Sequence, residues 1–128
     1  MTKFHDTFAK YLARVEKAQG KMRKSIVVST DVKTAPLLAQ KGIKRMPIAW
    51  PLHKHNMFYV VTVPPNSRIK SHSHDEDVFR YLSKGSLVLN GSIQIKEGMW
   101  FVVKANTSYN ITTKSGYTAV AGYQFECH

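Results

Sequence analysis

From Met57 onward, short apolar runs alternate with turn residues at close and regular intervals along the chain. Asn90-Gly91 lies between Leu87-Val88-Leu89 and Ile93-Gln94-Ile95, and it favours a two-residue hairpin because both residues tolerate positive φ. Pro64-Pro65-Asn66 marks another turn. Strands this short and this closely spaced are typical of a sandwich or barrel. The expected strands are Met57–Val63, Ile69–His74, Val78–Leu82, Ser86–Leu89, Ser92–Ile95, Met99–Val103, Tyr109–Thr113 and Tyr117–Phe125.

The first part of the chain has the pattern of an amphipathic helix. Apolar residues recur with the spacing of one helical face over residues 4–19, and Gly20 suits the end of the helix. The residues of this face are Phe4, Phe8, Tyr11, Leu12 and Val15. Ser25–Ser29 is expected to form a short strand, and residues 30–56 to form a loop with a short helix near Pro36 to Gln40.

These patterns predict a single all-β domain, a barrel with an N-terminal α-helix. Residues 1–56 are expected to supply the helix and a basic, proline-containing connector that packs on the barrel. Residues 57–128 are expected to form the barrel itself. A helix with one apolar face must bury that face, so we expect it to pack on the barrel or on a second subunit.

Composition limits the class of protein. A chain of 128 residues with 43% apolar and 21% charged residues is typical of one soluble globular domain. The single cysteine, Cys127, excludes an internal disulfide framework and a multi-cysteine zinc finger. Its apolar runs are too short to span a bilayer, and its first residues lack the apolar core of a secretory signal. We expect a cytoplasmic protein that does not bind membranes.

The net charge of +11 belongs mainly to the N-terminal segment. Residues 1–45 hold 11 Lys and Arg against 3 Asp and Glu, a balance of +8, while the other 83 residues hold 8 against 5, a balance of +3. No aromatic residues are interleaved with these lysines in the way that stacking on bases requires. We therefore interpret the excess as a solvated helix face, and nucleic-acid binding is not expected.

The chemistry concentrates in Ser71-His72-Ser73-His74 and the three carboxylates that follow. Side chains alternate faces in a strand, so His72 and His74 are expected to point the same way, with backbones roughly 6.6 Å apart. Two imidazoles and a nearby carboxylate form a set that holds a divalent metal with open coordination positions. The sequence thus predicts a site for a metal ion.

In a regular strand, Arg68 and Lys70 would share the face of His72 and His74, and two cations would repel a metal. Either the strand bulges before His72, or the site is tuned for an anionic substrate. The sequence leaves both open.

The chain resembles the cupin family of small jelly-roll barrels, which carry a metal in the barrel mouth. The resemblance covers about residues 57–125. In the family's first motif, Asn66 stands at the first glycine, His72 and His74 match the two histidines, and Gly85 matches the closing glycine. An apolar residue stands where the motif has its glutamate.

The second motif matches less well. Gly98 matches its first glycine, Lys104 and Asn106 replace a proline and a glycine, and Tyr109 and Thr113 replace the histidine and the asparagine. The resemblance therefore supplies two metal ligands, His72 and His74, and leaves the other two positions altered.

Asp77 is the preferred third ligand. Asp77, Phe79 and Tyr81 share one face of the strand that follows, and Arg80 lies on the other. Arg80 is costly to bury unpaired, so we expect the Asp77 face to line the interior. Glu76 is the next candidate.

Further candidates remain around the expected site. We expect Tyr109, with Tyr81 and Phe79, to shape a substrate pocket, although Tyr109 could also ligate the metal. His53 and His55 are expected at the surface, and His55 stays open as a further nitrogen ligand.

The resemblance implies a mononuclear divalent-metal enzyme, oxygenase-like (dioxygenase-like) or isomerase-like, that acts on a small metabolite, anionic if the cations face it. Iron, manganese, nickel and zinc are not distinguished. The alternative is a non-catalytic module that senses a small ligand or a metal, so whether the protein is an enzyme stays open. A homodimer is expected from the resemblance and from the apolar face of the helix.

Overall fold

The computed structural model describes residues 9, 10, 12, 13, 15, 17, 24–32, 37–40 and 42–124. Their elements, in chain order, are β1 (Ile26–Val28), η1 (Ser29–Asp31), β2 (Leu37–Gln40), β3 (Ile43–Arg45), η2 (Leu52–Lys54), β4 (Met57–Val63), β5 (Ser67–His72), β6 (Val78–Leu89), β7 (Ile93–Lys96), β8 (Trp100–Val103), β9 (Tyr109–Thr113) and β10 (Tyr117–Tyr123). In this part of the chain, no helix is both long and apolar enough to cross a bilayer.

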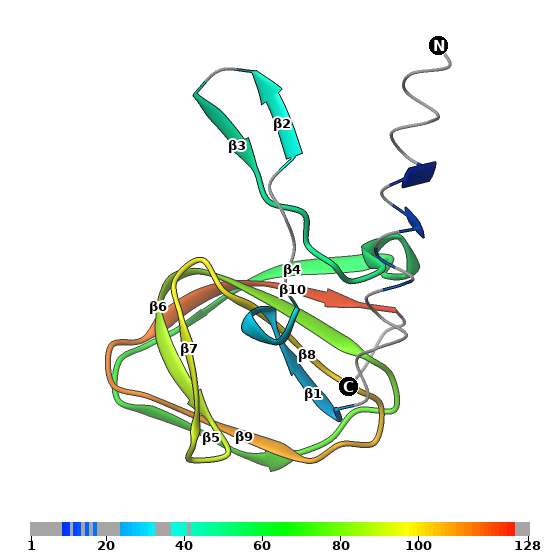
Figure 1. Ribbon diagram of the computed structural model, residues 1–128. Coiled ribbons are helices and arrows are strands. Elements are labelled where there is room, and N and C mark those ends of the chain that lie inside the picture. Colours follow the sequence, from blue (N-terminus) through cyan, green and yellow to red (C-terminus); the bar gives the residue numbers. More distant parts are fainter. Residues whose placement is uncertain are drawn as a thin grey trace.

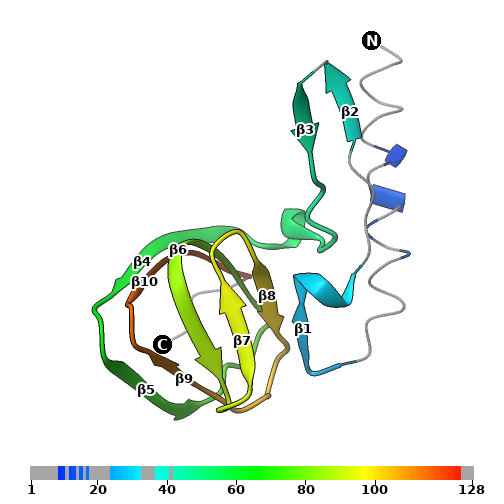
Figure 2. The same cartoon turned by 60° about the vertical axis from the view of Figure 1, so that its left-hand side comes forward.

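The strands form an antiparallel barrel, which confirms the all-β fold class (Figure 1). One side of the barrel has the strand order β1-β8-β6-β10-β4. On the other side, β6 pairs with β7 and β9, and β9 pairs with β5. The β2–β3 hairpin stands apart from the barrel in both views (Figures 1 and 2).

β6 belongs to both sides of the barrel because it bends at Gly85. Before this glycine it pairs with β8 and β10, and after it with β7 and β9. Gly85 has φ +81°, and a Cβ there would lie 2.1 Å from the carbonyl oxygen of Gly116. Only glycine fits this conformation and this close approach. The two strands predicted as Val78–Leu82 and Ser86–Leu89 are therefore one.

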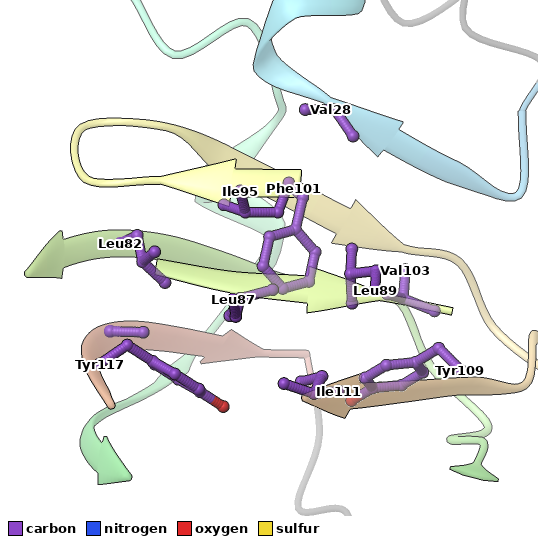
Figure 3. Packing of buried hydrophobic residues seen from close by; sticks show 11 residues of the cluster. Val28, Leu82, Leu87, Leu89, Ile95, Phe101, Val103, Tyr109, Ile111 and Tyr117 are labelled. Atoms are coloured by element: carbon purple, nitrogen blue, oxygen red, sulfur yellow. The ribbon is translucent and has the colours of Figure 1, made fainter. Parts of the chain in front are cut away.

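The barrel interior is filled by apolar side chains from both sides (Figure 3). Leu82, Leu87 and Leu89 of β6 lie in this core together with Ile95 of β7 and Phe101 of β8. Burying each such side chain contributes about 1.5–3 kcal/mol to folding.

A second apolar cluster covers the outer face of the first side. Trp50 and Ala49, from the segment that precedes η2, pack there against Phe79, Trp100 and Val102. The sheet is thus buried on both faces where this segment lies. That burial explains why β8 is apolar and buried in every position rather than in alternate ones.

Of the remaining local predictions, one turn and one strand are confirmed and one helix is wrong. Asn90 and Gly91 both have positive φ, at 50° and 71°, and join β6 to β7 as expected. The strand expected at Ser25–Ser29 is β1. The helix expected near Pro36 to Gln40 is wrong, because Gly42, with φ +82°, allows Leu37–Gln40 to fold back as a hairpin.

Most of the predicted N-terminal helix, residues 4–19, lies outside the described residues, as do Cys127 and the end of the strand predicted to reach Phe125. The helix therefore stays a prediction, and so does the division of the chain at residue 56. β1, which precedes that boundary, pairs with β8 of the barrel.

Candidate functional site

A bulge in β5 brings the two histidines of the motif to the barrel interior. Ile69 pairs with Ile111, and His72 pairs with Tyr109, so β5 holds one more residue than β9 between these pairs. The extra residue shifts the alternation of the strand, and Arg68 and Lys70 are exposed. The first of the two alternatives left by the sequence, a bulge before His72, is therefore the one observed.

The imidazoles of His72 and His74 lie close together, with ring centroids 5.0 Å apart. Nδ1 of His72 lies 2.8 Å from the carbonyl oxygen of Lys70 and donates to it. This hydrogen bond fixes the ring and leaves Nε2 as its basic nitrogen. The backbone carbonyl of His74 accepts a hydrogen bond from the amide of Asn106 at 2.6 Å, which ties the end of β5 to the loop before β9.

Tyr109 lies at the centre of the site and is 1% exposed. Its hydroxyl is 3.2 Å from Nε2 of His74 and 3.4 Å from Nη2 of Arg80, and its ring centroid is 4.5 Å from that of His72. A guanidinium only donates, so the hydroxyl accepts from Arg80 and turns its own proton toward His74. Tyr109 thus links the cation to the imidazole.

Arg80 points into the barrel, opposite to the prediction. It pairs with Phe101 of β8 and with Ala121 of β10, and directly paired residues share a face. The side chain is 9% exposed, with its guanidinium carbon 5.6 Å from the ring centre of Tyr123. Nη1 of Arg80 has no hydrogen-bond partner among the residues that the structure describes.

The prediction that Phe79 and Tyr81 face the interior is therefore wrong. Both belong to the outer cluster, where Phe79 lies 6.1 Å from the ring of Trp100 and Tyr81 pairs with Trp100 across the strands. The sequence could not show which face of β6 points inward, because the outer face is covered and also carries large apolar side chains, Phe79 and Tyr81. Their role in binding a substrate stays a prediction without support from this arrangement.

The three carboxylates that follow the histidines differ in their burial and in the contacts that they make. Oδ1 of Asp77 accepts a hydrogen bond from the amide of Ala105 at 2.9 Å. Glu76 is buried, at 3% exposure, and Asp75 is exposed. No group of three or more His, Cys, Asp or Glu in the described part of the chain could hold a metal ion as the side chains stand. The ligand set His72, His74 and Asp77 stays a prediction.

His53 is exposed, as expected, but the prediction that His55 lies at the surface is wrong, because His55 is buried. Its Nε2 accepts a hydrogen bond from Nε1 of Trp50 at 3.0 Å, and its Nδ1 donates to the carbonyl oxygen of Gly122 at 3.1 Å. Both ring nitrogens are engaged, so His55 anchors the segment around Trp50 to the sheet and has no nitrogen left for a metal.

Burial and the neighbouring cations disfavour the protonated form of His74. Burial lowers the pKa of His74, and the neighbouring His72 and Arg80 lower it further, while Glu76 and Asp75 oppose them. Burial raises the pKa of the nearby Tyr117, and the cation of Arg80 partly offsets this. The guanidinium of Arg80 therefore lies near an imidazole, that of His74, whose protonated form is disfavoured.

Two surface grooves lie away from this cluster. One, of about 610 Å³, is lined by Arg68, Val88, Gln94 and Thr112 among others, and it lies over β5, β6, β7 and β9. The other, of about 700 Å³, lies over the outer cluster beside Tyr81 and Trp100. Neither includes a residue of the histidine motif.

No protein-family model matches the chain, and no curated protein matches it. Among solved structures, protein NMB1881 from Neisseria meningitidis is similar over 73% of this chain and 89% of its own, with 19% identity and a TM-score of 0.46. KdgF from a Halomonas species is similar over 78% and 94%, with 14% identity and a TM-score of 0.48. A predicted oxalate decarboxylase from Thermotoga maritima is similar over 77% and 78%, with 19% identity and a TM-score of 0.43. At these values the likeness carries no activity to this chain.

Proposed function

We propose that the protein binds a small carboxylate at the cluster formed by His72, His74, Arg80 and Tyr109, hereafter the arginine cluster. In this proposal the protein is a non-catalytic module that binds a small ligand. The observation that carries this proposal is the buried guanidinium of Arg80 with an unsatisfied Nη1.

A buried charge without a full set of partners costs several kcal/mol, and an anion that accepts its hydrogen bonds offsets that cost. A carboxylate suits a guanidinium best, because its two oxygens match two N–H groups in parallel. Tyr109 already holds Nη2 of Arg80, which orients the group. His72 and His74 are only partly buried, so their side of the arginine cluster faces solvent.

The surroundings of Arg80 favour a small anion that binds in one orientation. Oδ1 of the nearby Asp77 already accepts a hydrogen bond from the amide of Ala105 at 2.9 Å. The aromatic ring of Tyr123 closes one face of the guanidinium, at 5.6 Å. An anion therefore approaches in the plane of the guanidinium, where its hydrogen-bond donors point.

Thermal shifts with a panel of small anions test this proposal. We expect formate, acetate, oxalate, malonate or succinate to raise the melting temperature of the wild-type protein more than chloride does at equal ionic strength. Arg80→Met should abolish the shift. Arg68→Gln, which removes an exposed cation from the bulged strand, is the matched control and should keep it. A panel without any shift, or equal shifts in both variants, would contradict the proposal.

A divalent-metal enzyme, oxygenase-like or isomerase-like, is the second candidate. The 5.0 Å separation of the two imidazoles and the buried carboxylate of Glu76 favour it. The described side chains do not complete a metal site as they stand. Asp77 accepts a hydrogen bond from the amide of Ala105, and the hydroxyl of Tyr109 links the guanidinium of Arg80 to His74. Iron, manganese, nickel or zinc would need Glu76 or Asp77 to turn toward His72 and His74.

Elemental analysis of purified protein distinguishes the two candidates. A stoichiometric transition metal that is lost in His72→Ala and kept in His53→Ala would establish the second candidate. Metal content below one tenth of the protein concentration in wild type, after incubation with each ion and desalting, would remove it.

A further inference from the structure

The groove of about 610 Å³ lies on the outer face of β5, β9, β6 and β7, on one side of the barrel (Figure 2). A groove of this volume suits a small-molecule ligand. Directly paired residues share a face of a sheet, and the register places one side chain of each strand in a row across the groove. In strand order, this row is Arg68, Thr112, Val88 and Gln94.

This row of side chains faces solvent. Val88 follows Leu87, which lies in the core, and neighbouring side chains of a strand point to opposite faces. Arg68 and Gln94, at the two ends of the row, are exposed. Neighbouring strands lie about 4.8 Å apart, so the row spans about 14 Å. That length accommodates a sugar ring together with a substituent.

The groove carries positive charge without a compensating acid. Arg68 of β5 and Lys114, directly after β9, both line it and are exposed. Neither forms an ion pair with a carboxylate in the described part of the chain, and none of the described lining residues is acidic. Residues 57–124 contain four carboxylates, of which three follow the histidine motif and one, Glu97, lies in the turn after β7. Two cations together in such a place favour an anion with two charges.

The uncharged lining residues offer hydrogen bonds rather than a surface for stacking. Hydroxyl and amide side chains predominate among them: Asn66, Ser67, Ser86, Gln94, Thr112 and Thr113. Such groups both donate to and accept from the hydroxyl groups of a ligand. No aromatic residue is among the described residues that line the groove, so the bases of a nucleic acid would find no ring to stack on.

We propose that this groove binds the phosphate ester of a small polyol, such as a sugar phosphate. Arg68 and Lys114 hold the phosphate, which carries a charge of about −1.5 to −2 at pH 7 and accepts hydrogen bonds through three oxygens. Thr112 and Gln94 bind the hydroxyl groups of the polyol. The proposal is independent of the arginine cluster, because no residue of that cluster lines the groove.

Isothermal titration calorimetry with glucose 6-phosphate, glycerol 3-phosphate, inorganic phosphate and glucose tests this proposal. At least one of the two esters should bind more tightly than inorganic phosphate, and glucose should give no measurable binding. The affinity for the ester should fall as the ionic strength rises, because both cations are exposed.

Two double variants with the same change of net charge locate the binding. Arg68→Gln combined with Lys114→Gln should weaken the binding of the ester about tenfold or more, since both charge-assisted contacts are lost. Lys54→Gln combined with Lys84→Gln is the matched control, because both lysines are exposed and neither lines the groove. This control should keep the dissociation constant within about twofold.

Backbone amide signals in NMR test the site in the wild-type protein, without any variant. During titration with the tighter ester, the signals of Thr112 and Gln94 should shift saturably, and that of Tyr109 should not. Arg80→Met should keep the binding of the ester, which separates this groove from the arginine cluster. Esters that bind no better than inorganic phosphate, equal losses in the two double variants, or shifts at Tyr109 rather than Thr112 would overturn the proposal.

Discussion

The two halves of β6 differ in what they bury, because only the half before Gly85 buries a charged side chain. Beyond Gly85, Leu87 and Leu89 lie opposite Ile95 and Ile93 of β7 in an interior made of hydrocarbon. Before it, Arg80 lies in the same interior, against Tyr109 and Tyr123. The first kind of burial stabilises the fold, and the second costs free energy unless a partner offsets it.

Under the proposed function, Leu87 and Leu89 serve packing, whereas Arg80 serves the recognition of an anion. A hydrophobic side chain would fit the Arg80 position in terms of the fold, because Phe101, Ala121 and Leu82 surround it on the neighbouring strands and on β6. A buried guanidinium there is best explained by an anion that it holds.

The junction between the halves should be the most sensitive position. Gly85→Ala places a Cβ 2.1 Å from the carbonyl oxygen of Gly116 at a φ of +81°, so the strands must separate. We expect a loss of about 4 kcal/mol or more in the free energy of unfolding, or no folded protein. Gly91→Ala, with φ +71° but no atom within 4 Å of the added Cβ, should cost only about 1 kcal/mol. Urea unfolding of both variants measures the difference, and equal losses would contradict the role given to the junction.

The hydrocarbon half should respond as an ordinary core. Leu87 is 1% exposed, and Leu87→Ala should lower the free energy of unfolding by about 2–5 kcal/mol because it leaves a cavity. Val88→Ala, on the outward face of the same strand, should cost much less, since Val88 is only partly buried. Denaturant unfolding measures both, and a small effect of Leu87→Ala would show that this half is loosely packed.

The polar half should respond in the opposite direction. Arg80→Met removes a buried charge and fills its volume with an apolar chain, so the free energy of unfolding without ligand should stay level or rise by about 1–4 kcal/mol. The same variant should lose the thermal shift caused by carboxylates. A destabilisation comparable to that of Leu87→Ala would mean that Arg80 serves the fold rather than a ligand.

The smallest expected effect is the pH dependence of stability that arises from His55. Burial lowers the pKa of His55 below its usual 6.5, so the folded protein holds the neutral ring while the unfolded chain takes up a proton. Stability is therefore complete above about pH 6.5 and falls as the pH drops toward the folded-state pKa. Burial lowers the pKa of His74 as well, so that ring contributes in the same direction. His55→Gln should flatten this decline, while His53→Gln, at an exposed position, should not. Melting temperatures between pH 7.5 and 5 measure the slopes.

Local patterns in the sequence predicted much of the fold. The strand and turn spacing gave the barrel, Asn90-Gly91 gave a hairpin, and the His-x-His pattern gave two imidazoles on one face. The conflict of Arg68 and Lys70 with that face left two explanations, a bulge or an anionic substrate, and the structure shows the bulge.

What the sequence could not give depends on contacts between distant segments. The phase of Arg80 in β6 follows from the covering of the outer face by Trp50, which makes Phe79 a packing residue. The continuity of β6 through Gly85 depends on the close approach of Gly116. The burial of His55 likewise requires Gly122 and Trp50 as hydrogen-bond partners, neither of which its local sequence reveals.

The nitrogen resonance of the Arg80 side chain, followed by NMR during titration with a small carboxylate, tests the central claim most directly. The Nε–H signal of Arg80 should shift saturably with the concentration of ligand, with one constant, and the signal of the exposed Arg68 should not. An Arg80 signal that stays unchanged at saturating carboxylate, or one that shifts no more than Arg68, would contradict the claim that this buried guanidinium recognises an anion.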